Sequence, residues 1–534
     1  MKSTNQFSII FLSSFLYFLF QFKTHSRIGL VGLTGFEPAA SASRTQRSTK
    51  LSHNPKPFTL YHFLLTKAKE QKRKFLNFDF VLYKNRIFWY NQFMYKNDTI
   101  AAISTALQVA AIGIVRVSGC DSFNIVNKFF KPNNKDEKFL PNMLIYGKFC
   151  VGNFTDNCMC VKFLAPKSYT GEDMAEFHCH GGVEVVKGIL NAIINSGLNV
   201  RLAENGEFTR RAFINGKFDL SRAEGVIEMI TAESQAELIA ASRLADGGLY
   251  NETVKFQNEL TDIISNLEVL IDYPDEKVEL NDLNKRLREI YANLQNLNDT
   301  YSVGKVLKDG INLVICGASN VGKSSLINAL LNFDRAIVTE IAGTTRDTIE
   351  ERLEINGVKF NIVDTAGFRE SDNVIEKIGI SRSKSAIKNA DIILYVIEPQ
   401  KVNEDKELLK QFKNKKVITV LNKIDLKIKC DKRSDIEISA KYNKNIDKLK
   451  DLIFKTANIN NIFDNLVIIS LRHYNALLKA ALRLGNLIEN LNTLTLDIIA
   501  FEIKGVWDIL GEITGTTATE EIINNIFEKF CLGK

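Results

Sequence analysis

The chain has 534 residues, too many for one ordinary hydrophobic core, and this length predicts two to four domains. Its 45% hydrophobic and 25% charged residues are typical of a globular protein and exclude a disordered one. The net charge of +7 arises in residues 1–93, which carry +11 and leave −4 for residues 94–534. Bulk charge therefore gives no support for nucleic-acid binding by residues 94–534. Eight scattered cysteines indicate reduced, cytoplasmic usage.

The first 93 residues differ from the rest of the chain. Their apolar run, Phe7–Phe20, has 14 residues, whereas a membrane span needs about 20. No small-x-small cleavage site follows cleanly, as it would after a signal peptide. We therefore expect no membrane partner. Our hypothesis is that translation starts at Met94 and that residues 1–93 are a spurious or disordered extension.

Three segments of the next part each place one charged residue beside glycine or apolar neighbours. These residues are Arg116, Glu176 and Lys217. A guanidinium, a carboxylate and an ammonium together suit a ligand with both donors and acceptors. Taken alone, each is more often a surface charge.

Cysteines and histidines in the same region raise the alternative of a zinc site. The candidates are Cys158-x-Cys160 and His178-Cys179-His180. The C-x-C spacing is tight, and an H-C-H run in a strand points its side chains to alternate faces, so the ligands cannot converge easily. We favour buried thiols and a core or loop histidine instead.

A helical pattern follows. Leucine and isoleucine recur in Asn284–Tyr301 at spacings of three and four residues. This pattern usually marks packing in a helix bundle rather than a cofactor site, and we expect helices here.

An apolar strand, a glycine-containing loop and a helix are predicted in succession within Ile311–Leu330. The loop reads G-x-x-x-x-G-K-S from Gly317 to Ser324. In such a loop the backbone N–H groups and the helix N-terminus face phosphate. Lys323 would reach the β and γ phosphate oxygens, and Ser324 would ligate Mg²⁺. The placement between strand and helix makes the motif specific.

The segments expected to sense the γ-phosphate come next. Thr339–Asp347 resembles a switch I segment, in which Thr345 would supply the second Mg²⁺ hydroxyl. A hairpin that turns at Asn356-Gly357 leads to the Asp-Thr-Ala-Gly run that starts at Asp364. Asp364 would hold Mg²⁺ through water, and Gly367 would sense the γ-phosphate.

Two later segments suit the guanine base. Asn422 and Asp425 follow a predicted strand, and Asp425 can accept hydrogen bonds from guanine that adenine cannot donate. Ile438–Lys441 resembles the last guanine loop. The residues predicted to bind GTP are Asn320, Val321, Gly322, Lys323, Ser324, Ser325, Thr339, Glu340, Ile341, Ala342, Gly343, Thr344, Thr345, Asp364, Thr365, Ala366, Gly367, Asn422, Lys423, Asp425, Ser439, Ala440 and Lys441.

One expected residue is missing. In Ras-like proteins a glutamine follows the glycine that corresponds to Gly367, and this glutamine orients the attacking water. Here Phe368 occupies that position. Asn320 could offer its oxygen to a monovalent cation that neutralises the developing charge. Carbonyl oxygens would complete the cation's shell, from Thr339, Ile341 and Thr344. Glu376 is the best-placed carboxylate for the water, although residues alone do not separate it from a solvated surface charge.

The chain ends in Phe-Cys-Leu-Gly-Lys. A free thiol reacts as the thiolate, which a neighbouring cation favours. Cys531 beside Lys534 could therefore take part in covalent chemistry. The alternative is a docked tail that does no chemistry.

Together these motifs resemble one family. The phosphate-loop asparagine, the G-T-T-R-D run, D-T-A-G followed by a hydrophobic residue, and the downstream E-x-x-G-I are similar to the bacterial tRNA modification GTPases called MnmE or TrmE. Four other segments and the F-C-L-G-K end also match this family, so the resemblance extends from Met94 to Lys534. The four segments are Asn97–Gly119, which resembles the start of the family, Ser168–Gly182, Arg201–Val226 and Ile271–Glu276.

The resemblance implies an α/β and all-α multidomain fold. An α+β folate-binding N-terminal domain would occupy residues 94–213. An all-α helical domain would form in two halves, 214–306 and 457–534. A Ras-like P-loop GTPase domain with a mixed sheet and helices on both faces would be inserted between them, at 307–456.

The resemblance also implies an activity. The family is activated by K⁺, dimerises through its GTPase domains, and adds an aminomethyl or carboxymethylaminomethyl group to C5 of wobble uridine 34 in tRNA. Its one-carbon donor is 5,10-methylene- or 5-formyl-tetrahydrofolate. Its flavoprotein partner, of the MnmG or GidA family, holds FAD and forms a heterotetramer with the homodimer.

Residue roles follow from the same resemblance. Glu376 would be the catalytic carboxylate, and Cys531 would sit near the one-carbon donor. We expect the tail to face the folate pocket across a dimer. The folate ligands would be Arg116, Glu176, Lys217 and Lys534.

One segment departs from the family. The Pro-Pro-Gly-rich loop is replaced by Ser104–Gly113, which has no proline and one glycine, and this puts the shape of the folate pocket in doubt. A rival interpretation is a ribosome-assembly GTPase of the Era or Der type, without modification chemistry. That type carries a KH-like domain with a G-x-x-G loop, which we do not find after residue 457.

Overall fold

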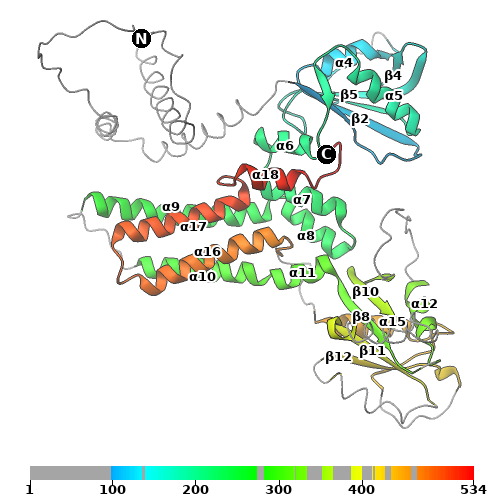
Figure 1. Cartoon of the computed structure of the whole chain (residues 1–534), viewed down its shortest axis with the longest axis vertical. Coiled ribbons are helices and arrows are strands. Elements are labelled where there is room, and N and C mark those ends of the chain that lie inside the picture. The colour runs from blue at the N-terminus through cyan, green and yellow to red at the C-terminus, as the bar shows by residue number, and fades with distance from the viewer. Residues whose placement is uncertain are drawn as a thin grey trace, which may run out of the picture. The chain divides into compact units, whose positions relative to one another are not determined.

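The computed structural model describes residues 98–134, 139–273, 282–318, 320–332, 351–364, 386–399, 412, 415–426, 434–458 and 466–534. All of them belong to one compact unit. Along the chain they form a seven-stranded sheet, a group of helices, a six-stranded sheet, and then three more helices that return to the first group (Figure 1).

The first sheet has the strand order β3-β4-β5-β6-β2-β1-β7. Its strands are β1 (Thr99–Ile103), β2 (Ile112–Ser118), β3 (Phe130–Pro132), β4 (Leu144–Val151), β5 (Phe154–Phe163), β6 (Met174–His180) and β7 (Val200–Leu202). Alternate residues of β4 are buried, as expected for a sheet with one covered face. That face packs on α4 (Ser122–Phe129) and α5 (Val183–Ile194). The opposite face therefore presents partly exposed side chains, among them Arg116 and Glu176.

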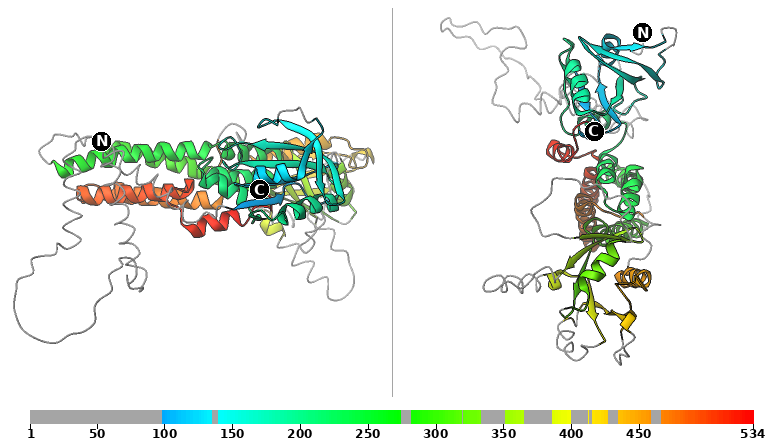
Figure 2. Two further views of the ribbon diagram at one scale, coloured as in Figure 1. Left: turned by 90° about the horizontal axis from the view of Figure 1, so that it is seen from above. Right: turned by 90° about the vertical axis from the view of Figure 1, so that its right-hand side faces the viewer.

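Helices form the next part. They are α6 (Glu207–Ile214), α7 (Leu220–Thr231), α8 (Gln235–Ala245), α9 (Gly248–Asp272), α10 (Leu283–Asp299), α11 (Tyr301–Asp309), α16 (Leu471–Asn490), α17 (Leu496–Thr514) and α18 (Glu520–Phe527). α9 packs on α17, α17 on α16 and α16 on α10, and these long helices run side by side (Figures 1 and 2). The predicted helix in Asn284–Tyr301 is confirmed, because Leu287, Ile290 and Leu294 form its buried stripe in α10.

The second sheet has the order β13-β12-β11-β8-β10-β9 and is mixed, because β9 alone pairs antiparallel. Its strands are β8 (Ile311–Cys316), β9 (Glu351–Ile355), β10 (Val358–Asp364), β11 (Ile392–Ile397), β12 (Lys416–Leu421) and β13 (Ile436–Glu437). Alternate residues of β8 enter two different apolar clusters, so both faces of the sheet are covered. One of these clusters contains residues of α12 (Lys323–Asn332) and α15 (Ile446–Ala457). The predicted turn at Asn356-Gly357 is confirmed, with φ of 50° and 80°.

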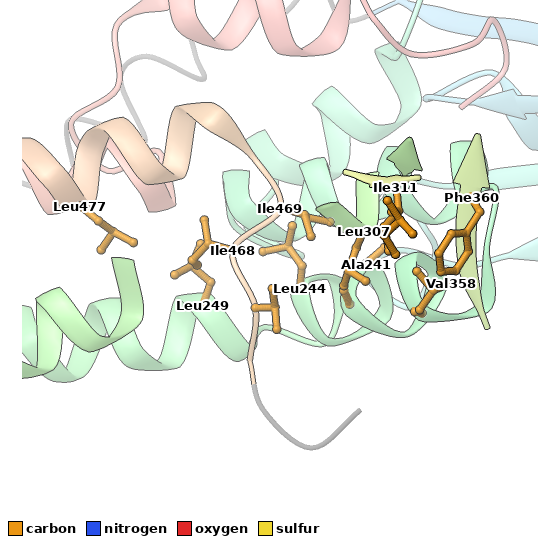
Figure 3. Packing of buried hydrophobic residues seen from close by; sticks show 14 of the residues in the cluster. Ala241, Leu244, Leu249, Leu307, Ile311, Val358, Phe360, Ile468, Ile469 and Leu477 are labelled. Carbon is orange, nitrogen blue, oxygen red and sulfur yellow. The ribbon is translucent and has the colours of Figure 1, made fainter. Parts of the chain in front are cut away.

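One apolar cluster joins the second sheet to the helices (Figure 3). Val358 and Phe360 of β10 lie beside Leu307 of α11 and Ala241 of α8, and all four are fully buried. Hydrogen bonds support this packing: Ala236 N of α8 donates to the turn carbonyl of Gly357 at 2.8 Å. The second sheet and the helices therefore share a continuous core.

The expected fold class is confirmed: an α+β part, a helical part, and a P-loop GTPase part with a mixed sheet. The described residues after 458 form only helices and their connections, with no strand on which a KH-like domain could be built. Within the described part of the chain, no helix is both long and apolar enough to cross a membrane.

Candidate functional site

The phosphate loop leaves the carboxyl end of β8 and enters α12. Gly317 and Gly322 have φ of +151° and +96°, which favour glycine. A Cβ at Gly317 would lie 2.2 Å from Val396 O, and one at Gly322 would lie 2.4 Å from Asn422 Nδ2. Both positions therefore require glycine, because a Cβ would clash with a neighbouring atom and because other residues rarely adopt these positive φ angles.

Lysine and serine side chains stand at the start of α12. Lys323 Nζ donates to Gly317 O at 3.0 Å and to Ala318 O at 2.9 Å, so its ammonium lies over the loop. Ser324 and Ser325, in the first turn of the helix, are exposed. A hydroxyl and an ammonium at a helix N-terminus fit a magnesium-bound phosphate.

Asn422 connects the phosphate loop to both guanine loops. Its side chain is 2% exposed, its Nδ2 donates to Val321 O at 2.9 Å, and its Oδ1 accepts from Ala440 N at 3.0 Å. Asp425 is exposed, and its Oδ1 accepts from Ser439 Oγ at 2.7 Å. The structure thus brings the predicted phosphate and base segments together and leaves the Asp425 carboxylate open to solvent.

Lys423 adds a second connection. Its Nζ donates to Asn320 O and to Glu398 Oε2, both at 2.6 Å. Asn320 itself is exposed and adopts a φ of +66°. Its carbonyl, rather than its side chain, is the group that contacts Lys423. Lys441, also predicted here, lies with its Nζ 5.2 Å from the centre of the Tyr442 ring.

Other predicted residues lie outside the described part of the chain. These are Thr339, Glu340, Ile341, Ala342, Gly343, Thr344, Thr345, Thr365, Ala366, Gly367 and Glu376. Asp364 is the last residue of β10, which places its backbone at the same sheet edge as the phosphate loop.

A second site is built on the first sheet. Arg116 of β2 and Glu176 of β6 are paired in register, and Arg116 Nε donates to Glu176 Oε1 at 2.8 Å. His178, two residues along β6, lies with its Nε2 3.1 Å from Glu176 Oε2. Burial alone would raise the pKa of Glu176, but the hydrogen bond with His178 and the charge of Arg116 outweigh it and hold the pKa below its ordinary value. The carboxylate is therefore ionised at neutral pH.

Aromatic rings enclose the guanidinium. The Arg116 Cζ lies 5.5 Å from the ring centre of Tyr169 and 5.7 Å from that of Phe208. Burial raises the pKa of Tyr169, and its hydroxyl lies 2.9 Å from Thr209 Oγ1. Lys217, predicted to join this site, donates instead to Pro166 O at 2.8 Å. A stacked cation with a carboxylate partner suits a planar, polar ligand.

The tail contacts this second site. Gly533 O accepts from Ser104 Oγ at 3.2 Å and lies 3.5 Å from Arg116 Nη1. Cys531 is exposed, and Lys534 N donates to Cys531 O at 3.3 Å. The tail therefore faces the predicted pocket, as expected. These contacts lie within one chain, and an arrangement of the tail across a dimer stays a prediction.

The loop Ser104–Gly113, which departs from the family, starts at the residue that contacts the tail. After Ser104 it runs over the surface, and Leu107 and Val109 are 54% and 87% exposed. It returns through Ala110, whose N donates to Gly181 O at 3.1 Å. Its first residue thus contacts the tail, while most of the loop faces solvent.

The cysteines and histidines of the zinc alternative face opposite ways. Cys158, Cys160 and Cys179 lie in the apolar core, where burial raises the pKa of Cys158 to about 12 and of Cys179 to about 11. His178 is bound to Glu176, and His180 Nδ1 lies 2.5 Å from Asp156 Oδ1. The buried thiols match the interpretation, whereas the histidines differ from it: both lie in strand β6, His178 partly buried and His180 exposed, and neither is in the core or in a loop.

The structure brings three residues into these sites that were not predicted as their ligands: Glu398, His178 and Ser104. His178 was considered only for zinc, and Ser104 only as the start of the loop Ser104–Gly113. Glu398 follows the buried strand β11, at the edge where the phosphate loop leaves β8. The rule that sites form at the carboxyl ends of parallel strands could have found it. His178 and Ser104 had no comparable signal, since each depends on a pairing between distant strands or on the tail.

Comparisons with known proteins agree with this geometry. A family model of the MnmE helical domain matches residues 220–531, and one described as GTP-binding protein TrmE N-terminus matches residues 99–217. A tRNA modification GTPase MnmE from Clostridioides difficile (strain 630) is 40% identical over 463 residues, which is 83% of this chain and 100% of the relative. Another, from Natranaerobius thermophilus, is 39% identical over 457 residues, 82% of this chain and 99% of the relative. The chain therefore belongs to the MnmE family of tRNA modification GTPases.

Proposed function

We propose that this GTP-hydrolysing enzyme uses nucleotide turnover to drive a one-carbon modification at C5 of the wobble uridine of certain tRNAs. One observation carries the proposal: a single chain holds both a connected set of phosphate and base loops and a separate charged pair, Arg116 and Glu176, beside a cysteine-containing tail. The product would carry an aminomethyl or carboxymethylaminomethyl group.

In the nucleotide site, each described residue has a distinct task. Lys323 would hold phosphate oxygens, Ser324 would ligate Mg²⁺, and Asp425 would accept hydrogen bonds from the guanine edge. Asn422 keeps the phosphate and base loops at a fixed separation. When bound, Mg²⁺ neutralises charge on the phosphates.

Two further residues complete the hydrolytic proposal. Asn320 is exposed within the phosphate loop, and Lys423 holds its carbonyl, so its side-chain oxygen would be the group that binds K⁺. The carbonyls of Thr339, Ile341 and Thr344 would share that ion. Its charge would replace that of an arginine finger. Glu376 would orient the attacking water in place of the missing glutamine.

The charged pocket would hold a tetrahydrofolate derivative. Arg116 offers donors and Glu176 an ionised acceptor, while the rings of Tyr169 and Phe208 give the pocket planar walls. Lys217 and Lys534 would bind the anionic end of the ligand. The bound folate, 5,10-methylene- or 5-formyl-substituted, supplies the carbon. Cys531 is exposed, two residues before the Gly533 that contacts Arg116, and would act on that group.

The assembly proposed here is a homodimer that binds a flavoprotein of the MnmG or GidA family, with FAD on the partner, as a heterotetramer. The net charge of −4 on residues 94–534 supports a division of labour in which the flavoprotein supplies much of the tRNA-binding surface. K⁺-dependent pairing of GTPase domains would then control the modification site.

GTP turnover in K⁺ and in Na⁺ tests the hydrolytic part. We expect turnover at least about tenfold faster in K⁺, and equal rates would remove the role given to Asn320. Glu376→Ala should abolish turnover and keep GTP binding, while the nearby Glu370→Ala serves as the matched control. For the folate part, Arg116→Ala should remove tRNA modification, measured by nucleoside mass spectrometry, and leave GTP turnover intact.

A further inference from the structure

The end of the chain is anchored at two points, one on the helices and one on the first sheet beside Arg116. Phe530 is 2% exposed and packs in a cluster with residues of α7 and α18. Below it, Gly206 has a φ of +66°, and a Cβ there would lie 2.5 Å from Phe527 O and 2.9 Å from Phe530 Cβ. Figure 1 shows the C-terminus beside α6, in agreement with these contacts.

Gly533 is the second anchor. It has a φ of +88°, and a Cβ would lie 2.3 Å from Ile103 O and 3.1 Å from Ser104 Cα. Both obstacles are backbone atoms of the sheet, which cannot move aside as a flexible side chain could. Its carbonyl accepts from Ser104 and faces Arg116. Glycine is thus required here for both space and conformation.

We propose that Gly533 is a positioning residue that seats the tail on the pocket of its own chain, so that Cys531 serves that pocket in cis. This proposal rests on the proposed folate function. The same guanidinium, that of Arg116, reaches Glu176 through Nε and the tail carbonyl through Nη1. Phe530 and Gly533 are three residues apart, and three residues span about 11 Å at most. A tail anchored at both points cannot reach the pocket of a partner chain.

The first test replaces Gly533 with Ala. A displacement of about 1 Å can cost about a hundredfold in rate, so we expect wobble modification to fall at least about tenfold while GTP turnover stays within about twofold. The matched control is Gly197→Ala, which has a φ of +78° but nothing within 4 Å of the added Cβ. It should keep both activities. Ser104→Ala, which removes one donor to the tail, should give a smaller loss of modification.

The second test separates cis from trans. Cells without their own copy express two chains together, one with Gly533→Ala and one with Arg116→Ala. In cis, no pocket has both an intact guanidinium and a seated tail, so modification stays at the level of the single variants. In trans, random pairing would let the intact tail of one chain serve the intact pocket of the other, and about a quarter of wild-type modification would return.

The outcomes distinguish the proposals. Recovery to about a quarter would overturn the cis arrangement. Full modification by the Gly533→Ala chain would overturn the positioning role. If Arg116→Ala alone modified tRNA normally, the folate function would fail instead, whatever the tail variants do.

Discussion

Replacing Glu398 with Gln should weaken nucleotide binding, although Glu398 belongs to none of the predicted GTP-binding segments. Glu398 is 7% exposed and pairs with Lys423 at 2.6 Å. The same ammonium holds the carbonyl of Asn320 in the phosphate loop. Gln keeps the size of the side chain and an acceptor oxygen but removes the charge, so Lys423 is held more weakly and the loop loses part of its support.

The size of the effect follows from burial. Breaking a fully buried ion pair costs about 3–5 kcal/mol, and exposed pairs contribute about 0.2–1 kcal/mol. Here Lys423 is 34% exposed, so screening reduces the buried value, and we expect about 1–2 kcal/mol. This corresponds to a rise in the Kd for GDP of about fivefold to thirtyfold.

The assay is a fluorescence titration with a methylanthraniloyl-labelled GDP. Glu437→Gln is the matched control, because Glu437 is an exposed glutamate at the edge strand β13. In the variant Lys423→Met, adding Glu398→Gln should change the Kd little further, since both changes break the same pair. A Glu398→Gln Kd within about twofold of wild type, or full additivity of the two changes, would refute the reasoning.

Two further predictions concern buried groups. In the helical part, the Glu224 carboxylate contacts the side chains of Arg472 and His473. Burial would raise the pKa of Glu224, but the charges of these two partners hold that pKa well below its ordinary value of 4.5. The stabilisation by ionised Glu224 is thus complete above pH 4.5 and is lost as the pH falls toward the pKa of Glu224 in the folded protein. Glu224→Gln should therefore lower the free energy of unfolding, measured by urea denaturation, by about 3–5 kcal/mol near neutral pH and by less in acid. A difference between variant and wild type that does not change with pH would contradict this. Brief treatment of the native protein with iodoacetamide near pH 8 should label the exposed Cys531 and spare Cys158, because burial raises the pKa of Cys158 to about 12. Peptide mass spectrometry would measure the labelling, and equal labelling of the two cysteines would contradict the burial of Cys158.

Local signals in the sequence were sufficient to propose the nucleotide site. The phosphate loop, the turn at Asn356-Gly357 and the pair Asn422 and Asp425 each depend on residues close together in the chain, between elements whose hydrophobic pattern is strong. The structure adds how these loops are joined. The strands β8, β11, β12 and β13 are parallel neighbours, so the loops at their carboxyl ends lie close together. Asn422 can therefore hydrogen-bond to two of these loops at once.

Contacts between distant residues could not be predicted in the same way. Arg116 and Glu176 are 60 residues apart, and only the register of β2 with β6 makes them a pair. The tail meets Arg116 across 417 residues, and no periodicity or spacing encodes that contact. Its placement in the same chain follows from the anchors at Phe530 and Gly533, which depend on tertiary packing.

The continuous core in Figure 3 limits how this protein can be dissected. Only Gly310 separates α11 from β8, and the spot looks like a natural place to cut out a minimal GTPase. Such a fragment would expose Val358 and Phe360 to water, at about 1.5–3 kcal/mol for each side chain. A fragment that keeps α8 and α11 would retain that cover, so low solubility or slow turnover of a shorter piece would reflect the cut and not the native enzyme.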